Sequence, residues 1–95
     1  MTTVHPGKVL VEGYLQPLSL SVNALAKRLK VPASRMNDIA LGRRGITADT
    51  ALRLARLCGG EAQTWLNLQT QYDLRKAEAA SLEQIEREVE PFSGA

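Results

Sequence analysis

The sequence is poor in the residues from which metal sites, disulfides and catalytic centres are built. Its 95 residues include one cysteine, Cys58, and one histidine, His5. A lone cysteine forms no internal disulfide, and one cysteine with one histidine is too small a ligand set for structural zinc. No convergent carboxylates accompany them, so we expect no metal, no cofactor and no enzymatic activity. Cys58 is expected to behave as a small buried hydrophobe.

Long apolar runs are missing as well. No stretch approaches the roughly 18 apolar residues that a membrane span needs, and the N-terminus lacks the residue order of a signal peptide. We therefore expect no membrane contact and a reducing, cytoplasmic location. Hydrophobic residues make up 44% of the chain and charged residues 23%, which is typical of one folded domain with a modest core.

Charge is distributed unevenly along the chain. Residues 27–56 contain eight Lys or Arg and two Asp, which gives +6, whereas residues 57–95 contain three basic and seven acidic residues, which gives −4. Residues 1–26 balance to zero. The pattern indicates that the middle of the chain faces a polyanion and that the C-terminal part faces water or a basic partner. Charge alone does not separate nucleic-acid binding from a solvated basic face.

Helix signals dominate and strand signals are nearly absent. Pro6 opens a first helix of about ten residues that ends at Pro17, and Ser21 and Thr47 are suited to cap later helices. In the fourth helix we expect Leu52 and Ala55 to face inward, with Leu54 and Cys58 as further candidates. The expected helices cover residues 6–16, 22–30, 33–41, 48–58 and 61–80. Their short connections predict an all-α, five-helix orthogonal bundle.

The second and third helices are joined by only two or three residues, between Leu29 and Pro32 or Ala33. Such a short joint is typical of a helix-turn-helix, here at about residues 21–41. The positions that must be buried for this pair to pack are Leu25, Ala26, Leu29, Val31, Met36 and Ile39. The positions that then point away from the core are Ala33, Ser34, Arg35, Asn37, Asp38 and Leu41. A helix displayed in this way fits the major groove of B-DNA.

At these residues the chain resembles the lambda-repressor-like (Cro-type, XRE) helix-turn-helix family. The segments "HPGKVLVEGYLQPLSLS", "ALAKRLKVPASRMNDI", "GRRGITADTALRLAR" and "WLNLQTQYDLR" further resemble the HigA-type, or VapI-like, antitoxin family across roughly residues 5–76. The resemblance implies a dimeric antitoxin that binds double-stranded operator DNA. It also implies neutralisation of a RelE-like, mRNA-cleaving (HigB-type) toxin and repression of the operon that encodes both proteins. We expect residues 1–76 to form the DNA-binding domain with a dimerising fifth helix, and residues 77–95 to form a polar C-terminal helix or a frayed tail.

Two residues depart from the usual helix-turn-helix pattern. Val22 stands where Gln often contacts the DNA backbone, which leaves that contact in doubt. Lys30 stands where the turn usually has Gly, so a left-handed backbone there would cost about 1 kcal/mol. Either the backbone of this turn differs slightly from the usual one, or a contact between Lys30 and a phosphate offsets the cost.

The chemistry of the exposed side chains suggests their roles on DNA. Arg35 can offer a bidentate fork to guanine, Ser34 and Asn37 can hydrogen-bond a base or a phosphate, and Ala33 can touch a thymine methyl. Asp38 either accepts from cytosine, enforces register by repelling the backbone, or pairs with Arg35 or Arg43. The phosphate-contact candidates are Ser21, Lys27, Arg28, Lys30, Arg43 and Arg44, although Ser21 also suits a helix cap and the basic residues also suit a solvated face.

One recognition helix contacts too few bases for operator-level affinity, so we expect a homodimer. The fifth helix has more apolar residues than one face can bury, and the candidate dimer-interface residues are Trp65, Leu66, Leu68, Tyr72 and Leu74. Two alternatives stay open: a stand-alone transcriptional regulator without a toxin, and a purely protein-binding inhibitor whose basic face docks on an acidic partner.

Overall fold

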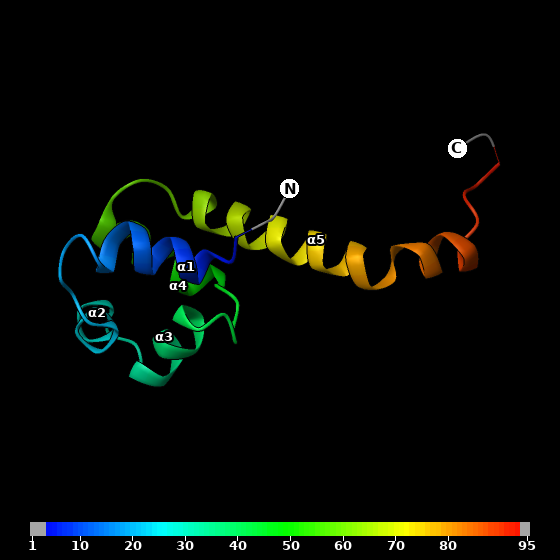
Figure 1. Cartoon of the computed structure of the whole chain (residues 1–95). Coiled ribbons are helices and arrows are strands. Elements are labelled where there is room, and N and C mark those ends of the chain that lie inside the picture. The colour runs from blue at the N-terminus through cyan, green and yellow to red at the C-terminus, as the bar shows by residue number, and fades with distance from the viewer. Residues whose placement is uncertain (1–3, 94–95) are drawn as a thin grey trace.

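The computed structural model describes residues 4–93, in which helices are joined by turns and loops and no strand occurs (Figure 1). Five α-helices and one π-helical segment follow one another along the chain, joined by short connections. They are α1 (Pro6–Leu10), η1 (Val11–Leu15), α2 (Val22–Leu29), α3 (Ala33–Ala40), α4 (Ala48–Cys58) and α5 (Ala62–Glu88). The all-α bundle expected from the sequence is confirmed. Over residues 4–93, no helix is both long enough and apolar enough to span a bilayer.

Three helices begin at side chains that accept a hydrogen bond from the first turn. Ser21 Oγ accepts from the amide of Ala24 at 3.0 Å, and Thr47 Oγ1 accepts from the amide of Thr50 at 3.5 Å. His5 caps α1, since its Nδ1 accepts from the amide of Gly7 at 2.9 Å. These bonds satisfy amides that have no partner inside the helix, which is why the helices start at these residues.

The first helical segment differs from the single α-helix expected between Pro6 and Pro17. It changes after Leu10 to π-helical geometry, in which the amide of Gln16 bonds to the carbonyl of Val11 at 2.9 Å. A π-type turn brings residues five apart onto one side. Leu10 and Leu15 are both buried in this way, whereas a continuous α-helix would turn one of them away from the core.

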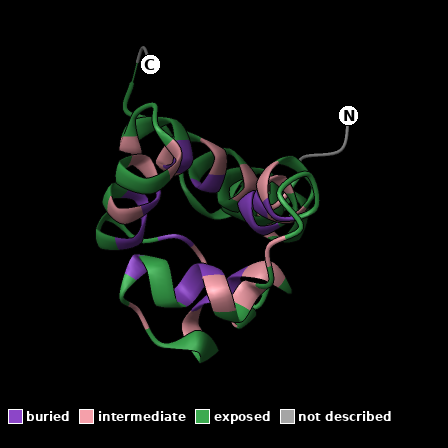
Figure 2. Cartoon of the chain, turned by 90° about the vertical axis from the view of Figure 1, so that its left-hand side faces the viewer, coloured by how far each residue is buried: buried purple, intermediate pink, exposed green. Residues whose placement is uncertain are grey.

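The core lies between α1, α2, α3, α4 and the first half of α5, and the buried positions face this interior (Figure 2). The buried apolar residues are Leu10, Leu15, Leu25, Ala26, Leu29, Met36, Ile39, Ile46, Ala51, Leu54 and Trp65.

The expectation that Leu52 faces inward is wrong. Its side chain is 64% exposed, because α4 turns Ala51 and Leu54 inward instead. Leu52 and Leu57 line a shallow groove of about 520 Å³ between α2 and α4.

Helix α5 has two parts with different surroundings. Its first part packs on α4 and α1 and buries Trp65 and Gln69. Its second part runs away from the bundle into solvent, which gives the molecule principal extents of 53 × 24 × 21 Å (Figure 1). The segment expected as either a polar helix or a frayed tail is therefore helical as far as Glu88, continuous with the rest of α5.

Gly7 allows the backbone of α1 to lie directly against α3. A Cβ at this position would overlap the carbonyl oxygen of Ile39, which has no flexible end that can move aside. We expect Gly7→Ala to lower the free energy of unfolding by about 1–3 kcal/mol, the usual cost of overpacking. Urea denaturation measures this.

Gly13→Ala is the matched control for this substitution, because a Cβ at Gly13 meets no atom within 4 Å. Its stability should stay the same or rise by up to about 1 kcal/mol through the smaller entropy of the unfolded chain. Equal effects of the two substitutions would contradict the close α1–α3 contact.

Candidate nucleic-acid interface

The joint between α2 and α3 is closed by a left-handed residue. Lys30 has φ 61° and ψ 43°, so the turn keeps the left-handed backbone even though the residue is not glycine. The amide of Lys30 donates to the carbonyl of Lys27 at 3.2 Å, and the amide of Val31 donates to the carbonyl of Ala26 at 3.1 Å. This pair of bonds is a Schellman motif. It ends α2 and redirects the chain into α3 within three residues.

Helix α3 buries one side and displays the other. Met36 and Ile39 are fully buried, whereas Ala33, Ser34, Asn37 and Leu41 are exposed. These positions divide as the sequence indicated, whereas Val31, Arg35 and Asp38 are half-buried. Helix α3 forms the lower edge of the bundle in Figure 1, on the side away from α5. We call the outer side of α3 the recognition face.

Arg35 lies half-buried at the edge of the recognition face. Its Nη1 is 3.5 Å from Oδ2 of Asp49 in the first turn of α4. The sequence had offered Asp38 as a partner for Arg35, and the structure corrects this, because Asp49 rather than Asp38 holds the guanidinium. Asp38 itself is half-buried, and its backbone carbonyl accepts from the amide of Arg43 at 2.8 Å.

Asn37 is held by two hydrogen bonds of its amide nitrogen. Nδ2 donates to the carbonyl of Ala33 at 2.9 Å and to Oδ1 of Asn23 at 3.1 Å. The second bond crosses from α3 to α2 and gives Asn23 a role that the sequence analysis missed. No local signal could have revealed it, because the two residues are 14 positions apart.

The basic candidates form two groups along the chain, before and after α3, and Arg28 also lines the groove between α2 and α4. Lys27, Arg28 and Lys30 lie at the end of α2, and Arg43 and Arg44 follow α3; all five are exposed. Ser21 serves as the N-cap of α2, so its hydroxyl already has a partner in the free protein.

The segment after α3 is fastened to α5 by one buried side chain. Oε1 of Gln69 accepts from the amide of Ile46 at 2.8 Å, and Nε2 of Gln69 donates to Oδ1 of Asp73 at 2.9 Å. Gly45 permits this contact, because a Cβ there would be only 3.0 Å from the side-chain carbonyl carbon of Gln69. Gln69 thereby positions the loop that carries Arg43 and Arg44, another role that the sequence did not reveal.

His5 links the start of the chain to the same part of α5. Its ring meets the ring of Tyr72 edge-on, with centroids 4.8 Å apart. Burial lowers the pKa of His5, the charge of Asp73 opposes this shift, and Lys76 adds to it. The lowered pKa favours the neutral imidazole, which is the form whose Nδ1 can accept from Gly7.

The residues suggested for a dimer interface are used in different ways. The structure corrects the prediction for Trp65. This residue is only 5% exposed and packs against Tyr14 in the core of its own chain, so it has almost no surface for a partner. Leu66, Leu68 and Tyr72 are half-buried. Leu74 is 55% exposed.

Cys58 and the acidic residues form no evident chemical centre. Within residues 4–93, no three His, Cys, Asp or Glu side chains are grouped so as to hold a metal ion. Cys58 is half-buried, and burial raises the pKa of its thiol, which disfavours the reactive thiolate.

Known proteins resemble this chain in both sequence and structure, although no family model matches it. Virulence-associated protein I of Dichelobacter nodosus is 60% identical over 78 residues, which cover 82% of this chain and 72% of that protein. The Pseudomonas aeruginosa antitoxin HigA, solved with the higBA promoter, is 46% identical with a TM-score of 0.92 and covers 96% of this chain and 99% of its own. An addiction module antidote protein of the HigA family from Coxiella burnetii is also 46% identical, with a TM-score of 0.90 and coverage of 97% and 100%.

Replacing Gln69 with Leu keeps the size of the side chain but removes the acceptor for the buried amide of Ile46. We expect the free energy of unfolding to fall by about 1–3 kcal/mol, the cost of an unsatisfied buried donor. Gln63→Leu is the control, because Gln63 is exposed on the same helix and bonds only to Asn67. If chemical denaturation shows equal losses for both variants, Gln69 is not the fastening described above.

Proposed function

This chain belongs to the HigA family of helix-turn-helix antitoxins, and we propose that it binds the operator of its own operon as a dimer and represses transcription. Its second activity is the neutralisation of a RelE-like, mRNA-cleaving toxin, the partner that membership of an antitoxin family implies. A transcriptional repressor acts where the DNA is, so we place the protein in the cytoplasm. We assign it no catalytic activity.

The observation that carries the proposal is the recognition face of α3. Its polar side chains lie outside the core on a short helix anchored by Met36 and Ile39, and exposed cations lie at the end of α2 and directly after α3. An α-helix fits the major groove, and cations beside it neutralise phosphates. The P. aeruginosa HigA structure with promoter DNA, which has nearly the same fold, supports operator binding by this fold.

The side chains of the recognition face divide the work between bases and phosphates. Arg35 presents its fork to a guanine, and Ser34 and Asn37 hydrogen-bond a base edge or a phosphate. Ala33 contacts a thymine methyl, and Asp38 disfavours wrong registers or accepts from a cytosine. Phosphate contacts come from the exposed cations, with Arg43 and Arg44 foremost.

Fluorescence anisotropy with the DNA immediately upstream of the gene and a scrambled duplex tests this assignment. Wild type should prefer the upstream DNA, and Arg35→Ala should lose about 1–3 kcal/mol of that preference, the value of one bidentate base contact. Arg35→Ala should keep salt-sensitive binding to both duplexes, because phosphate contacts remain.

Lys8→Ala, which removes an exposed cation of α1 that pairs with Glu12, should leave the preference unchanged. A wild-type protein that does not distinguish the two duplexes at physiological salt would contradict the repressor assignment and favour a basic face that docks on a protein. Co-purification of a small basic protein encoded beside this gene separates an antitoxin from a stand-alone regulator.

We place the dimer contact on the projecting half of α5. Leu74, Leu82 and Ile85 lie on one side of this half and are 55%, 41% and 48% exposed. A second copy packed on this side would remove the exposed apolar surface of these side chains from water. Its basic start, at Arg75 and Lys76, and its acidic end favour antiparallel pairing with a second copy.

Sedimentation velocity at micromolar concentration tests the dimer. Wild type should sediment as a dimer and Ile85→Asp as a monomer, because a carboxylate would be buried in the apolar contact. Leu18→Asp is the control, since Leu18 is 68% exposed between η1 and α2 and away from α5. A monomeric wild type would rule out the contact.

A further inference from the structure

Asp49 connects the recognition face to the rest of the helix-turn-helix. Its Oδ2 accepts from Nε of Arg53 at 2.9 Å and lies 3.5 Å from Nη1 of Arg35. One carboxylate oxygen thus holds two arginines, one on its own helix α4 and one on α3. The i,i+4 spacing of Asp49 and Arg53 is a local signal for this pair, whereas Arg35 lies 14 positions from Asp49 in the sequence.

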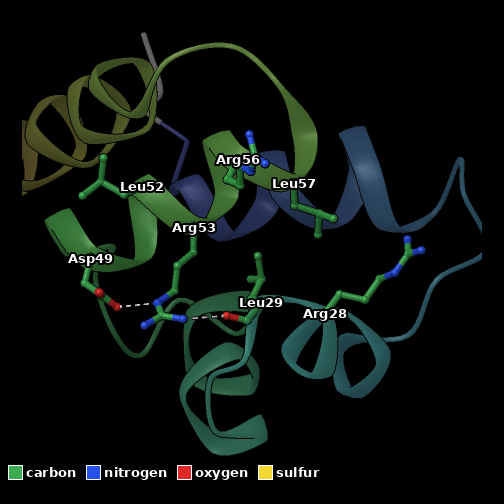
Figure 3. A pocket seen from close by; sticks show the side chains of 7 residues that line it. All are labelled: Arg28, Leu29, Asp49, Leu52, Arg53, Arg56 and Leu57. Atoms are coloured by element: carbon green, nitrogen blue, oxygen red, sulfur yellow. Dashed lines mark hydrogen bonds and ion pairs between the residues drawn. The ribbon is translucent and has the colours of Figure 1, made fainter.

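Arg53 fixes the place of this carboxylate. Its Nη1 donates to the backbone carbonyl of Leu29 at 2.9 Å, so the guanidinium spans from Asp49 to the C-terminal end of α2 (Figure 3). The carbonyls of the last helical turn lack partners within the helix, and a cation at that end is favourable. Asp49 is therefore anchored to α2 through Arg53.

Stability alone does not account for this arrangement. The side chains of Arg35, Asp49 and Arg53 are 31%, 59% and 41% exposed, and ion pairs at such exposure add little to folding. Their geometry, however, bears on DNA binding. A guanidinium has five N–H donors, so a contact through Nη1 leaves Arg35 other donors for a base. A carboxylate beside the recognition face also repels phosphates.

We propose that Asp49 is a positioning residue that determines specificity: it orients the guanidinium of Arg35 for reading a base and opposes binding where Arg35 finds no base partner. The inference rests on the proposed operator binding. At the operator, the repulsion between Asp49 and the backbone is offset by the preset geometry of Arg35. On other DNA nothing compensates for this repulsion. Asp49 therefore increases the ratio of the affinity for the operator to the affinity for other DNA.

Asp49→Asn tests this inference in the anisotropy assay described above. The variant should bind scrambled DNA about two- to threefold more tightly, because one charge near the phosphates is gone. Its ratio of operator to scrambled affinity should fall about tenfold, because Arg35 is no longer held. Glu12→Gln is the matched control, since it removes an exposed carboxylate that pairs with Lys8, away from the recognition face, and should leave the ratio unchanged.

The same substitution in an Arg35→Ala background separates positioning from a distortion of α4. With Arg35 absent, Asp49→Asn should change both affinities by one common factor and leave the ratio unchanged. A ratio that falls equally in both backgrounds would overturn the inference, and so would a wild-type preference that survives Asp49→Asn intact. A wild type without any preference would instead overturn the proposed operator binding, and the inference with it.

Discussion

Met36 and Ile39 are fully buried, and their burial determines how α3 sits in the molecule. Both side chains enter the core from a helix of only eight residues, so α3 has little freedom to rotate or slide. The close approach of α1 at Gly7 adds a backbone contact on the same inner side. Because the inner side is fixed, the outer side is fixed as well, and a short helix can present its polar side chains in a constant geometry.

The parts around α3 are held by a few directed interactions rather than by a large core. The left-handed turn at Lys30 sets where α3 begins, and Gln69 sets the course of the loop that follows it. Arg53 ties α4 to the end of α2. A protein that reads a DNA groove needs its side chains held in position. Here the residues that hold α3 and its neighbouring loop lie on other helices, not on the recognition face.

Helix α5 joins two functions in one element. Its first part completes the core with Trp65 and holds the loop that carries Arg43 and Arg44 through Gln69, while its second part leaves the bundle as an exposed helix with an apolar side. Pairing of two such helices would set the spacing between two recognition faces, since half-sites on B-DNA lie about 34 Å apart. The continuity of α5 therefore offers a rigid link between the dimer contact and the DNA-binding domain.

The sequence by itself determined the all-helical class, the position of the helix-turn-helix and the outer residues of α3, because these depend on local caps, breakers and the helical period. The caps Ser21 and Thr47 and the Met36–Ile39 spacing are each recognised from residues only a few positions away. The tertiary structure decided which apolar residues stay exposed, such as Leu52, and which are buried in the core, such as Trp65, because several helices compete to cover the same core. It also decided the π-helical turn before Gln16, the hold of Gln69 on Ile46, and the partner of Arg35. The last two contacts join residues 23 and 14 positions apart, and only the packing of one helix on another brings such pairs within bonding distance.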